Sequence, residues 1–278
     1  MQRQAVLFDL GWTLVVPRSG DWMLTPLFEQ TFPAWREAIS PAEMERAQQR
    51  PAAYLAENHR LTTLPQEVAQ ITRWYELLGE ALPALGMTPA KAAALAEDHT
   101  YNVAGNYVLL PGVREMLESL ARQGYALGVI SDTWPSVELQ LPAYGIDHLL
   151  DARTFSFALG AFKPHASLYR DALEQLGLPG SACWFVDDRP CNLMGAEQAG
   201  MRGVQSLAEP GARADGRFPA IKAPTELPDL LAGKSATDAW AAYQETLPEK
   251  DLPAMMALQA EMAAALPSPR WYFTSKEE

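Results

Sequence analysis

Short apolar runs alternate with helix-patterned stretches in the second half of this sequence, and this alternation limits the fold more than any other feature. Residues 125–130 read YALGVI and residues 182–186 read ACWFV, and the helical patterns before them end at Gly124 and Gly177. An apolar run of this length without polar alternation is typical of a strand buried on both faces. Strands that alternate with helices predict an α/β fold with a doubly wound parallel sheet.

The same rhythm continues on either side of these two runs. The apolar residues 5–8 predict a first strand, and residues 204–206 predict a weak last strand. Apolar residues spaced three and four apart, with proline or glycine near the ends, predict helices at 111–123, 167–176 and 191–199. Helices between strands are what a parallel sheet needs, because each strand must be reached by a crossover connection.

A helical insertion separates the first strand from the rest of this core. Residues 22–106 contain no strand-like run, and their helical patterns begin at or near proline, serine or threonine. The expected helices are 23–36, 41–58, 65–85 and 89–103. The sequence therefore predicts an all-helical cap (22–106) inserted into an α/β core (1–21 and 107–232). A C-terminal extension (233–278) is expected to form helices at 237–246 and 251–266.

The charge balance restricts the partners of this chain. Its 22 basic and 34 acidic residues give a formal net charge of −12. A surface of this sign repels nucleic acid and anionic membranes, because little basic charge is available to neutralise a row of phosphates. No run approaches the roughly 20 apolar residues of a membrane-spanning helix. We expect a cytoplasmic protein that binds a small molecule, with its oligomeric state left open.

Polar residues collect directly after the predicted strands. Four segments stand out: FDLGWTL at 8–14, VISDTW at 129–134, GAFKP at 160–164 and FVDDRPCNLMGA at 185–196. The carboxyl ends of parallel strands meet at one edge of a sheet, which is where α/β proteins bind ligands. Each segment taken alone is weak evidence, since a strand-end Asp often caps a helix or forms a turn.

Together the four segments contain what a magnesium and phosphate site requires. A phosphate is bound by backbone N–H groups and a cation, which Ser131 and Lys163 can supply. Magnesium requires hard oxygen ligands, available from Asp9, Asp188 and a carbonyl near Gly11. The adjacent carboxylates at 187 and 188 repel each other unless a cation lies between them.

In the order and spacing of these segments, residues 1–232 resemble the haloacid dehalogenase-like (HAD) superfamily, particularly its phosphatase-type branch with a helical cap after the first strand. The resemblance implies a hydrolase in which the Asp9 carboxylate is phosphorylated during turnover of a small phosphorylated metabolite. The implied site comprises the nucleophile Asp9, the phosphate-binding residues Ser131, Asp132 and Lys163, the Mg²⁺ ligands Asp9, Asp188 and the Gly11 carbonyl, and the supporting residues Thr13, Asp187 and Asn192.

One position departs from the family pattern. The first motif of the family usually reads Asp-x-Asp-x-Thr, and its second Asp transfers protons, whereas this chain has Gly11 there. Loss of a general acid–base group typically costs ~10²- to 10⁴-fold in rate. The dehalogenase branch also lacks this Asp, but it typically has an aromatic residue there and does not need the Asp pair. Lys91, the only lysine of the cap, has no feature of the Schiff-base lysine of a phosphonatase.

Three interpretations follow from Gly11. The chain is a phosphatase whose substrate has a good leaving group or whose cap supplies the proton, a slow enzyme that stalls as an aspartyl phosphate, or a catalytically inactive phosphate-binding or regulatory protein. The cap candidates for a proton donor are of residue types that usually lie at the solvated surface: Asp21, Glu29, His59 and His99.

Overall fold

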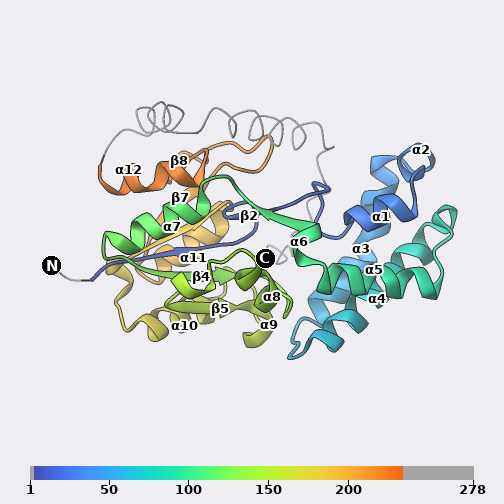
Figure 1. The fold of residues 1–278 in the computed structure, drawn as a ribbon, viewed down its shortest axis with the longest axis horizontal. Helices are drawn as coiled ribbons and strands as arrows, with labels where there is room; N and C mark the ends of the chain where they lie inside the picture. Colours follow the sequence, from blue (N-terminus) through green and yellow to red (C-terminus); the bar gives the residue numbers. More distant parts are fainter. Residues whose placement is uncertain (1–2, 234–278) are drawn as a thin grey trace.

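The computed structural model describes residues 3–233 and confirms the predicted α/β fold. Six parallel strands form one sheet in the order β5-β4-β1-β6-β7-β8 (Figure 1). The strands are β1 (Ala5–Phe8), β4 (Ala126–Ser131), β5 (Ala152–Phe155), β6 (Cys183–Asp187), β7 (Arg202–Ser206) and β8 (Ala220–Ile221). The first strand lies at the centre, between β4 and β6. The polar segments at 8–14, 129–134 and 185–196 therefore contain the ends of three neighbouring strands.

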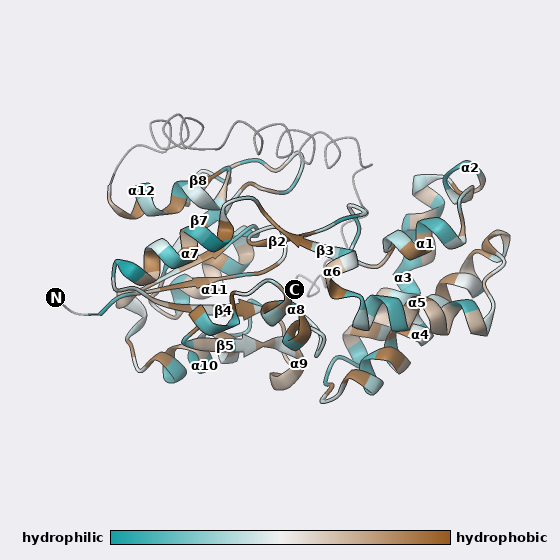
Figure 2. Ribbon diagram, in the orientation of Figure 1, coloured by the Kyte–Doolittle hydropathy of each residue, from teal (hydrophilic) through white to brown (hydrophobic). Residues whose placement is uncertain are grey.

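Alternate residues of each strand pack on opposite faces of the sheet. Val6 and Phe8 belong to a buried cluster with α7 (Val113–Arg122), α8 (Val137–Ala143) and α12 (Leu227–Leu231). Ala5 and Leu7 belong to a second cluster with α10 (Ala166–Leu176) and α11 (Pro190–Gln198). Figure 2 shows that α7 carries both polar and apolar residues, as a helix with one buried side requires. Burial on both faces explains why β1 and β4 consist of continuous apolar residues.

The helical insertion lies beside the sheet and has its own buried cluster (Figure 1). It contains α1 (Pro26–Thr31), α2 (Trp35–Ala38), α3 (Pro41–Glu57), α4 (Leu64–Ala81), α5 (Pro89–Tyr101) and α6 (Val103–Asn106). Ser40 and Glu43 form a reciprocal capping box at the start of α3, and Thr63 and Thr88 cap α4 and α5. Proline follows each cap within two positions, as the sequence pattern predicted.

Several elements differ from the sequence prediction. The helix expected at 23–36 is broken into α1 and α2, because Pro33 disfavours helical geometry at the residue before it. Four strands were not predicted: β5, β8, and the antiparallel pair β2 (Val15–Pro17) and β3 (Tyr107–Leu109), which connects the insertion to the core. The strand expected at 204–206 exists as β7, but β8 rather than β7 ends the sheet.

The remaining described elements are short. They are α9 (Ser156–Leu159) and one-turn 3-10 helices at Pro83–Leu85, Asp147–Leu149, Gly180–Ala182 and Pro224–Glu226. Among residues 3–233, no helix has both the length and the apolar character needed to cross a bilayer. The helices predicted at 237–246 and 251–266 lie outside the described residues.

Candidate active site

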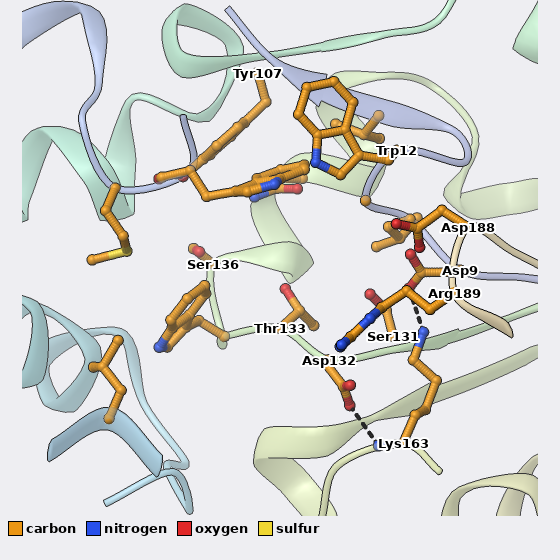
Figure 3. A pocket seen from close by; sticks show the side chains of 18 of the residues that line it. Asp9, Trp12, Tyr107, Ser131, Asp132, Thr133, Ser136, Lys163, Asp188 and Arg189 are labelled. Carbon is orange, nitrogen blue, oxygen red and sulfur yellow. Dashed lines mark hydrogen bonds and ion pairs between the residues drawn. The ribbon is translucent and has the colours of Figure 1, made fainter. Parts of the chain in front are cut away.

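The polar segments converge at the carboxyl edge of the sheet, where the strands end (Figure 3). Asp9 follows β1, Asp132 follows β4, and Asp187 ends β6. Lys163 arrives from the loop between α9 and α10. All four are buried or half-buried, and a cavity of about 160 Å³ opens between this edge and the helical insertion. The four-segment convergence that the sequence predicted is therefore present.

A buried lysine joins two of these carboxylates. The Nζ of Lys163 lies 2.6 Å from Oδ1 of Asp9 and 2.7 Å from Oδ2 of Asp187. Burial lowers the pKa of Lys163, but the charges of Asp187 and Asp9 outweigh this and raise it well above its usual range. The side chain therefore remains an ammonium, and it holds the Asp9 carboxylate, which lines the cavity.

Asp187 is held from three sides. Its Oδ1 accepts hydrogen bonds from the backbone N–H of Arg189 at 2.8 Å and from Nδ2 of Asn192 at 3.0 Å. With the Lys163 contact, these bonds satisfy a carboxylate that is 0% exposed. The supporting roles of Asp187 and Asn192 in the site stay predictions.

The acidic side chains form a cluster with the geometry of a cation site. One carboxylate oxygen from each of Asp9, Asp187 and Asp188 lies within 4.8 Å of the others. Within residues 3–233, the Asp188 carboxylate makes no hydrogen bond or ion pair. Burial and the charges of Asp187 and Asp9 raise its pKa well above the usual range. Three carboxylates facing one ammonium leave negative charge that a divalent cation with oxygen ligands fits.

The titration of Asp9 reflects the same crowding. Burial raises the pKa of Asp9 to about 6; the Lys163 ammonium opposes this rise, and the Asp187 carboxylate adds to it. The ionised form, which a nucleophile requires, predominates above that pH.

Ser131 and Asp132 both line the cavity. Oδ1 of Asp132 accepts the backbone N–H of Lys163 at 3.0 Å, so this side chain fixes the Lys163 loop to the end of β4. Burial raises the pKa of Asp132 to about 7, against the charge of Lys163, which lowers it. Thr13 is buried, and its hydroxyl has no hydrogen-bond partner among residues 3–233. Phosphate contacts by Ser131 and Asp132, and a supporting role for Thr13, stay predictions.

The space beside Gly11 is filled by an aromatic ring. A Cβ atom at position 11 would lie 3.2 Å from Cζ2 of Trp22 and 3.7 Å from Oδ2 of Asp9. Trp22 stacks on Tyr107, with ring centroids 5.5 Å apart, and meets Trp12 edge to face at 6.1 Å. A side chain at position 11 would have to displace Trp22, so an indole occupies the volume next to the usual acid–base position.

The cap candidates for proton transfer are mostly buried, which corrects the expectation that they lie at the surface. Asp21, His59 and His99 are 8%, 5% and 1% exposed. Oδ1 of Asp21 accepts the backbone N–H of Met23 at 2.8 Å, and Oε2 of Glu29 accepts a hydrogen bond from Trp35 at 3.0 Å. These hydrogen bonds give the carboxylates of Asp21 and Glu29 a structural role.

Among these four residues, His99 lines the cavity. Its Nε2 lies 3.1 Å from the hydroxyl of Tyr107. Burial lowers the pKa of His99 to about 4, so the ring is neutral near pH 7. A neutral imidazole engaged with Tyr107 is a poor source of protons for a leaving group.

The helical insertion holds the loop at residues 131–136 through contacts that the sequence analysis did not identify. Oε2 of Glu67 accepts the backbone N–H of Ser136 at 2.7 Å, and Oε1 of Gln70 accepts a hydrogen bond from the Trp134 indole at 2.9 Å. A signal was available, because Glu67 occupies a buried position of α4 four residues before Ile71. A charged residue on an apolar helix stripe indicates a specific polar partner.

Replacing Glu67 with Gln is expected to stabilise the protein at pH 8 and to have little effect at pH 4.5. Burial raises the pKa of Glu67 from 4.5 to about 7, against the Ser136 hydrogen bonds, which lower it. The folded state therefore favours the protonated form, and the contribution of this group to stability falls as the pH rises from 4.5 through 7. A difference of this size corresponds to roughly 3 kcal/mol. Denaturant unfolding at both pH values measures it.

The half-buried Glu76 on the same helix provides the matched control, because its carboxylate pairs with Arg73 at 3.0 Å. Glu76→Gln removes a carboxylate from the same helix without touching Ser136, and it is expected not to stabilise the protein at pH 8. If Glu67→Gln changed the free energy of unfolding equally at the two pH values, ionisation of the buried Glu67 would not be what lowers stability at pH 8.

Fold and site together define an α/β protein that gathers acidic side chains around one lysine at the carboxyl edge of its sheet. The model of the haloacid dehalogenase-like hydrolase family matches residues 4–200, and the chain belongs to this family.

Solved structures share the fold. A dehalogenase with an intermediate complex superimposes with a TM-score of 0.60 at 20% identity, over 82% of this chain and 96% of its own. L-2-haloacid dehalogenase from Xanthobacter autotrophicus, with chloropropionic acid covalently bound, gives 0.59 at 21% identity, over 84% of this chain and 100% of its own. At these identities the likeness extends to the fold alone.

Sequence relatives carry phosphatase names. Phosphoglycolate phosphatase of Pasteurella multocida is 34% identical over 101 residues, which are 36% of this chain and 45% of that protein. Hexitol phosphatase B of Escherichia coli is 31% identical over 111 residues, 40% of this chain and 50% of that protein. The chain spans about half the length of the curated relatives that it matches.

Proposed function

We propose that this protein is a magnesium-dependent phosphatase that hydrolyses a small phosphorylated metabolite through an aspartyl phosphate on Asp9. One observation carries the proposal: the carboxylates of Asp9, Asp187 and Asp188 lie within 4.8 Å of one another while Lys163 pairs with two of them. The phosphatase names of the sequence relatives support the reaction class. We also propose that residues 22–106 act as a cap over this edge.

The residues divide the chemistry as follows. The ionised Asp9 carboxylate attacks phosphorus, the P–O bond to the alcohol breaks, and the alcohol oxygen leaves with the electron pair. Lys163 holds Asp9 in place and, with Ser131, neutralises and orients the transferred phosphoryl group. Asp9, Asp188 and the Gly11 carbonyl would hold Mg²⁺, whose positive charge would reduce repulsion between the carboxylate and the phosphate. Water then attacks the aspartyl phosphate, which releases inorganic phosphate and restores Asp9.

The absence of a carboxylate at position 11 favours a second candidate, a catalytically weak phosphate-binding or regulatory protein. Without a proton-transfer group, an ordinary alcohol leaves ~10²- to 10⁴-fold more slowly. In that case the chain binds a phosphorylated ligand and releases no phosphate from it. Haloacid dehalogenation is a further outcome to test, since the fold alone permits it.

Phosphate release is expected to require Mg²⁺ and to fall ~10²-fold or more in Asp188→Asn, because the cation site then loses a charged ligand. Phenyl phosphate and a panel of phosphorylated metabolites are assayed with millimolar MgCl₂ and with EDTA, and chloropropionate is assayed for chloride release. The matched control is Asp215→Asn, an exposed Asp whose carboxylate accepts the backbone N–H of Arg217. Phosphate release that EDTA leaves unchanged would remove the metal from the proposal.

A further inference from the structure

An aromatic wall lines the cavity next to Asp9. Trp12, Trp22 and Tyr107 contribute to it, and Trp12 and Tyr107 lie along the same cavity as Asp9 and Asp188 (Figure 3). Trp12 and Tyr107 are 5% and 3% exposed, so their rings are packed in place rather than displayed to solvent. Trp22 links them through its stacked and edge contacts. The wall is therefore a rigid apolar surface.

The wall offers few polar groups to a leaving group. The Tyr107 hydroxyl is already engaged, 3.1 Å from Nε2 of His99, which leaves the indole N–H groups of Trp12 and Trp22. A polyol or carboxylate leaving group placed against these ring faces would recover few of its hydrogen bonds to water, which is unfavourable. An apolar or aromatic group would gain contact with the rings.

The size of the cavity also limits the leaving group. Its volume of about 160 Å³ includes the part lined by Asp9, Ser131 and Lys163, where the phosphoryl group would lie. The leaving group has only the remaining space beside the aromatic wall, so a compact group no larger than one six-membered ring suits it.

The lack of a proton donor at position 11 favours some leaving groups over others. Because Gly11 supplies no proton, the leaving oxygen departs as an anion, and its stability controls the first step. A phenol has a pKa of ~10, whereas the pKa of water, a model for an alkyl alcohol, is several units higher. A Cβ at position 11 would lie 3.2 Å from Cζ2 of Trp22, so the aromatic wall borders the position that lacks the acid–base group.

We propose that the substrates of this site are phosphate monoesters of aromatic alcohols, an inference that rests on the phosphatase function proposed above. Asp9 attacks phosphorus, the bond from phosphorus to the aryl oxygen breaks, and the aryloxide leaves with the electron pair. Water then hydrolyses the aspartyl phosphate, and a proton from this water neutralises the aryloxide in solution. The products are a phenol and inorganic phosphate, and no oxidant or further reactant is needed.

Three monoesters separate the contributions of shape and leaving group. Phenyl phosphate has the ring and the weakly basic oxygen, cyclohexyl phosphate has a similar size with an alkyl oxygen, and 2-phosphoglycolate is small and carries a carboxylate. With Mg²⁺, kcat/KM is expected to be at least ~10²-fold higher for phenyl than for cyclohexyl phosphate, because only the latter needs the missing acid. Cyclohexyl phosphate is expected to exceed 2-phosphoglycolate by ~10-fold, because only the former matches the apolar wall.

A variant of the wall tests the surface independently. Trp22→Ala is expected to raise KM for phenyl phosphate ~10-fold while leaving KM for 2-phosphoglycolate unchanged, because only the aromatic ester uses the indole. Trp184→Ala is the matched control, since this tryptophan lies on β6 against Arg202, outside the residues that line the cavity. It is expected to leave both KM values unchanged.

The outcomes distinguish this inference from the proposed function. If phosphate release from all three esters is the same in the wild type and in Asp9→Asn, the phosphatase function itself is wrong. If release depends on Asp9 but cyclohexyl phosphate or 2-phosphoglycolate equals phenyl phosphate, the phosphatase function stands and the aromatic substrate class is overturned. The wild-type series decides this even if Trp22→Ala does not fold.

Discussion

Asp9→Asn is expected to reduce phosphate release from phenyl phosphate by ~10⁴-fold or more, on the scale seen when a catalytic nucleophile is removed. An amide oxygen is a far weaker nucleophile than a carboxylate, so the first covalent step is lost. The substitution preserves shape, and the amide oxygen can still accept the hydrogen bond that Lys163 donates at 2.6 Å. Folding should therefore survive, and single-turnover rates with Mg²⁺ measure the effect.

The matched control for this variant is Asp147→Asn. Asp147 begins the 3-10 helix before β5 and therefore lies toward the opposite edge of the parallel sheet. It is expected to retain the wild-type rate. A wild-type rate in Asp9→Asn would mean that a different group accepts the phosphoryl group or that water attacks directly.

Lys163→Met is expected to lower both stability and activity. It removes the ammonium that neutralises Asp9 and Asp187, which are 7% and 0% exposed, and leaves their charges unpaired. Breaking a buried ion pair in this way typically costs ~3–5 kcal/mol. For a chain of this size that corresponds to a fall in Tm of roughly 6–20 °C. Loss of one group that stabilises the transition state lowers kcat by ~10²- to 10³-fold.

The loss of stability is expected to depend on pH. Burial raises the pKa of Asp9 to about 6 even with Lys163 present, and without the ammonium it must lie higher. At pH 5 the carboxylate is protonated in the variant, so Lys163→Met should be less destabilising there than at pH 8. Calorimetry at the two pH values checks this, with Lys222→Met, a substitution of an exposed lysine, as the control. A smaller loss at pH 8 than at pH 5 would contradict the ion-pair account.

The sequence predicted those strands whose residues must be apolar because the strand is buried on both faces. β1 and β4 are buried on both faces, so their continuous apolar residues identify them. β5 has the sequence ARTF, and its half-buried Arg153 interrupts the apolar pattern because this strand lies at one margin of the sheet. Its pairing with β4 comes from tertiary contacts, which a local pattern does not contain.

Some residues of the candidate site could be predicted from local sequence patterns, and others could not. Asp9 and Asp187 could be predicted because each follows or ends a strand whose position is evident from its apolar pattern. Lys163 follows elements that were not predicted, and only its place in the order of the four polar segments indicated it. The role of Trp22 could not be predicted, since its contact with position 11 depends on how the helical insertion packs against the core. The hydrogen bond between Glu67 and Ser136 could not be predicted either, because it joins residues 69 positions apart.

The most direct test of the central claim is the detection of a phosphoryl group on Asp9. The protein is mixed with phenyl phosphate and Mg²⁺, quenched in acid within a single turnover, digested and analysed by tandem mass spectrometry. Because Gly11 provides no base to activate water, the second step is slow, and the covalent species should accumulate. We predict one phosphoryl group per chain on Asp9, absent from Asp9→Asn. Phosphate release without any labelled Asp9, or a label on Ser131 instead, would contradict the account.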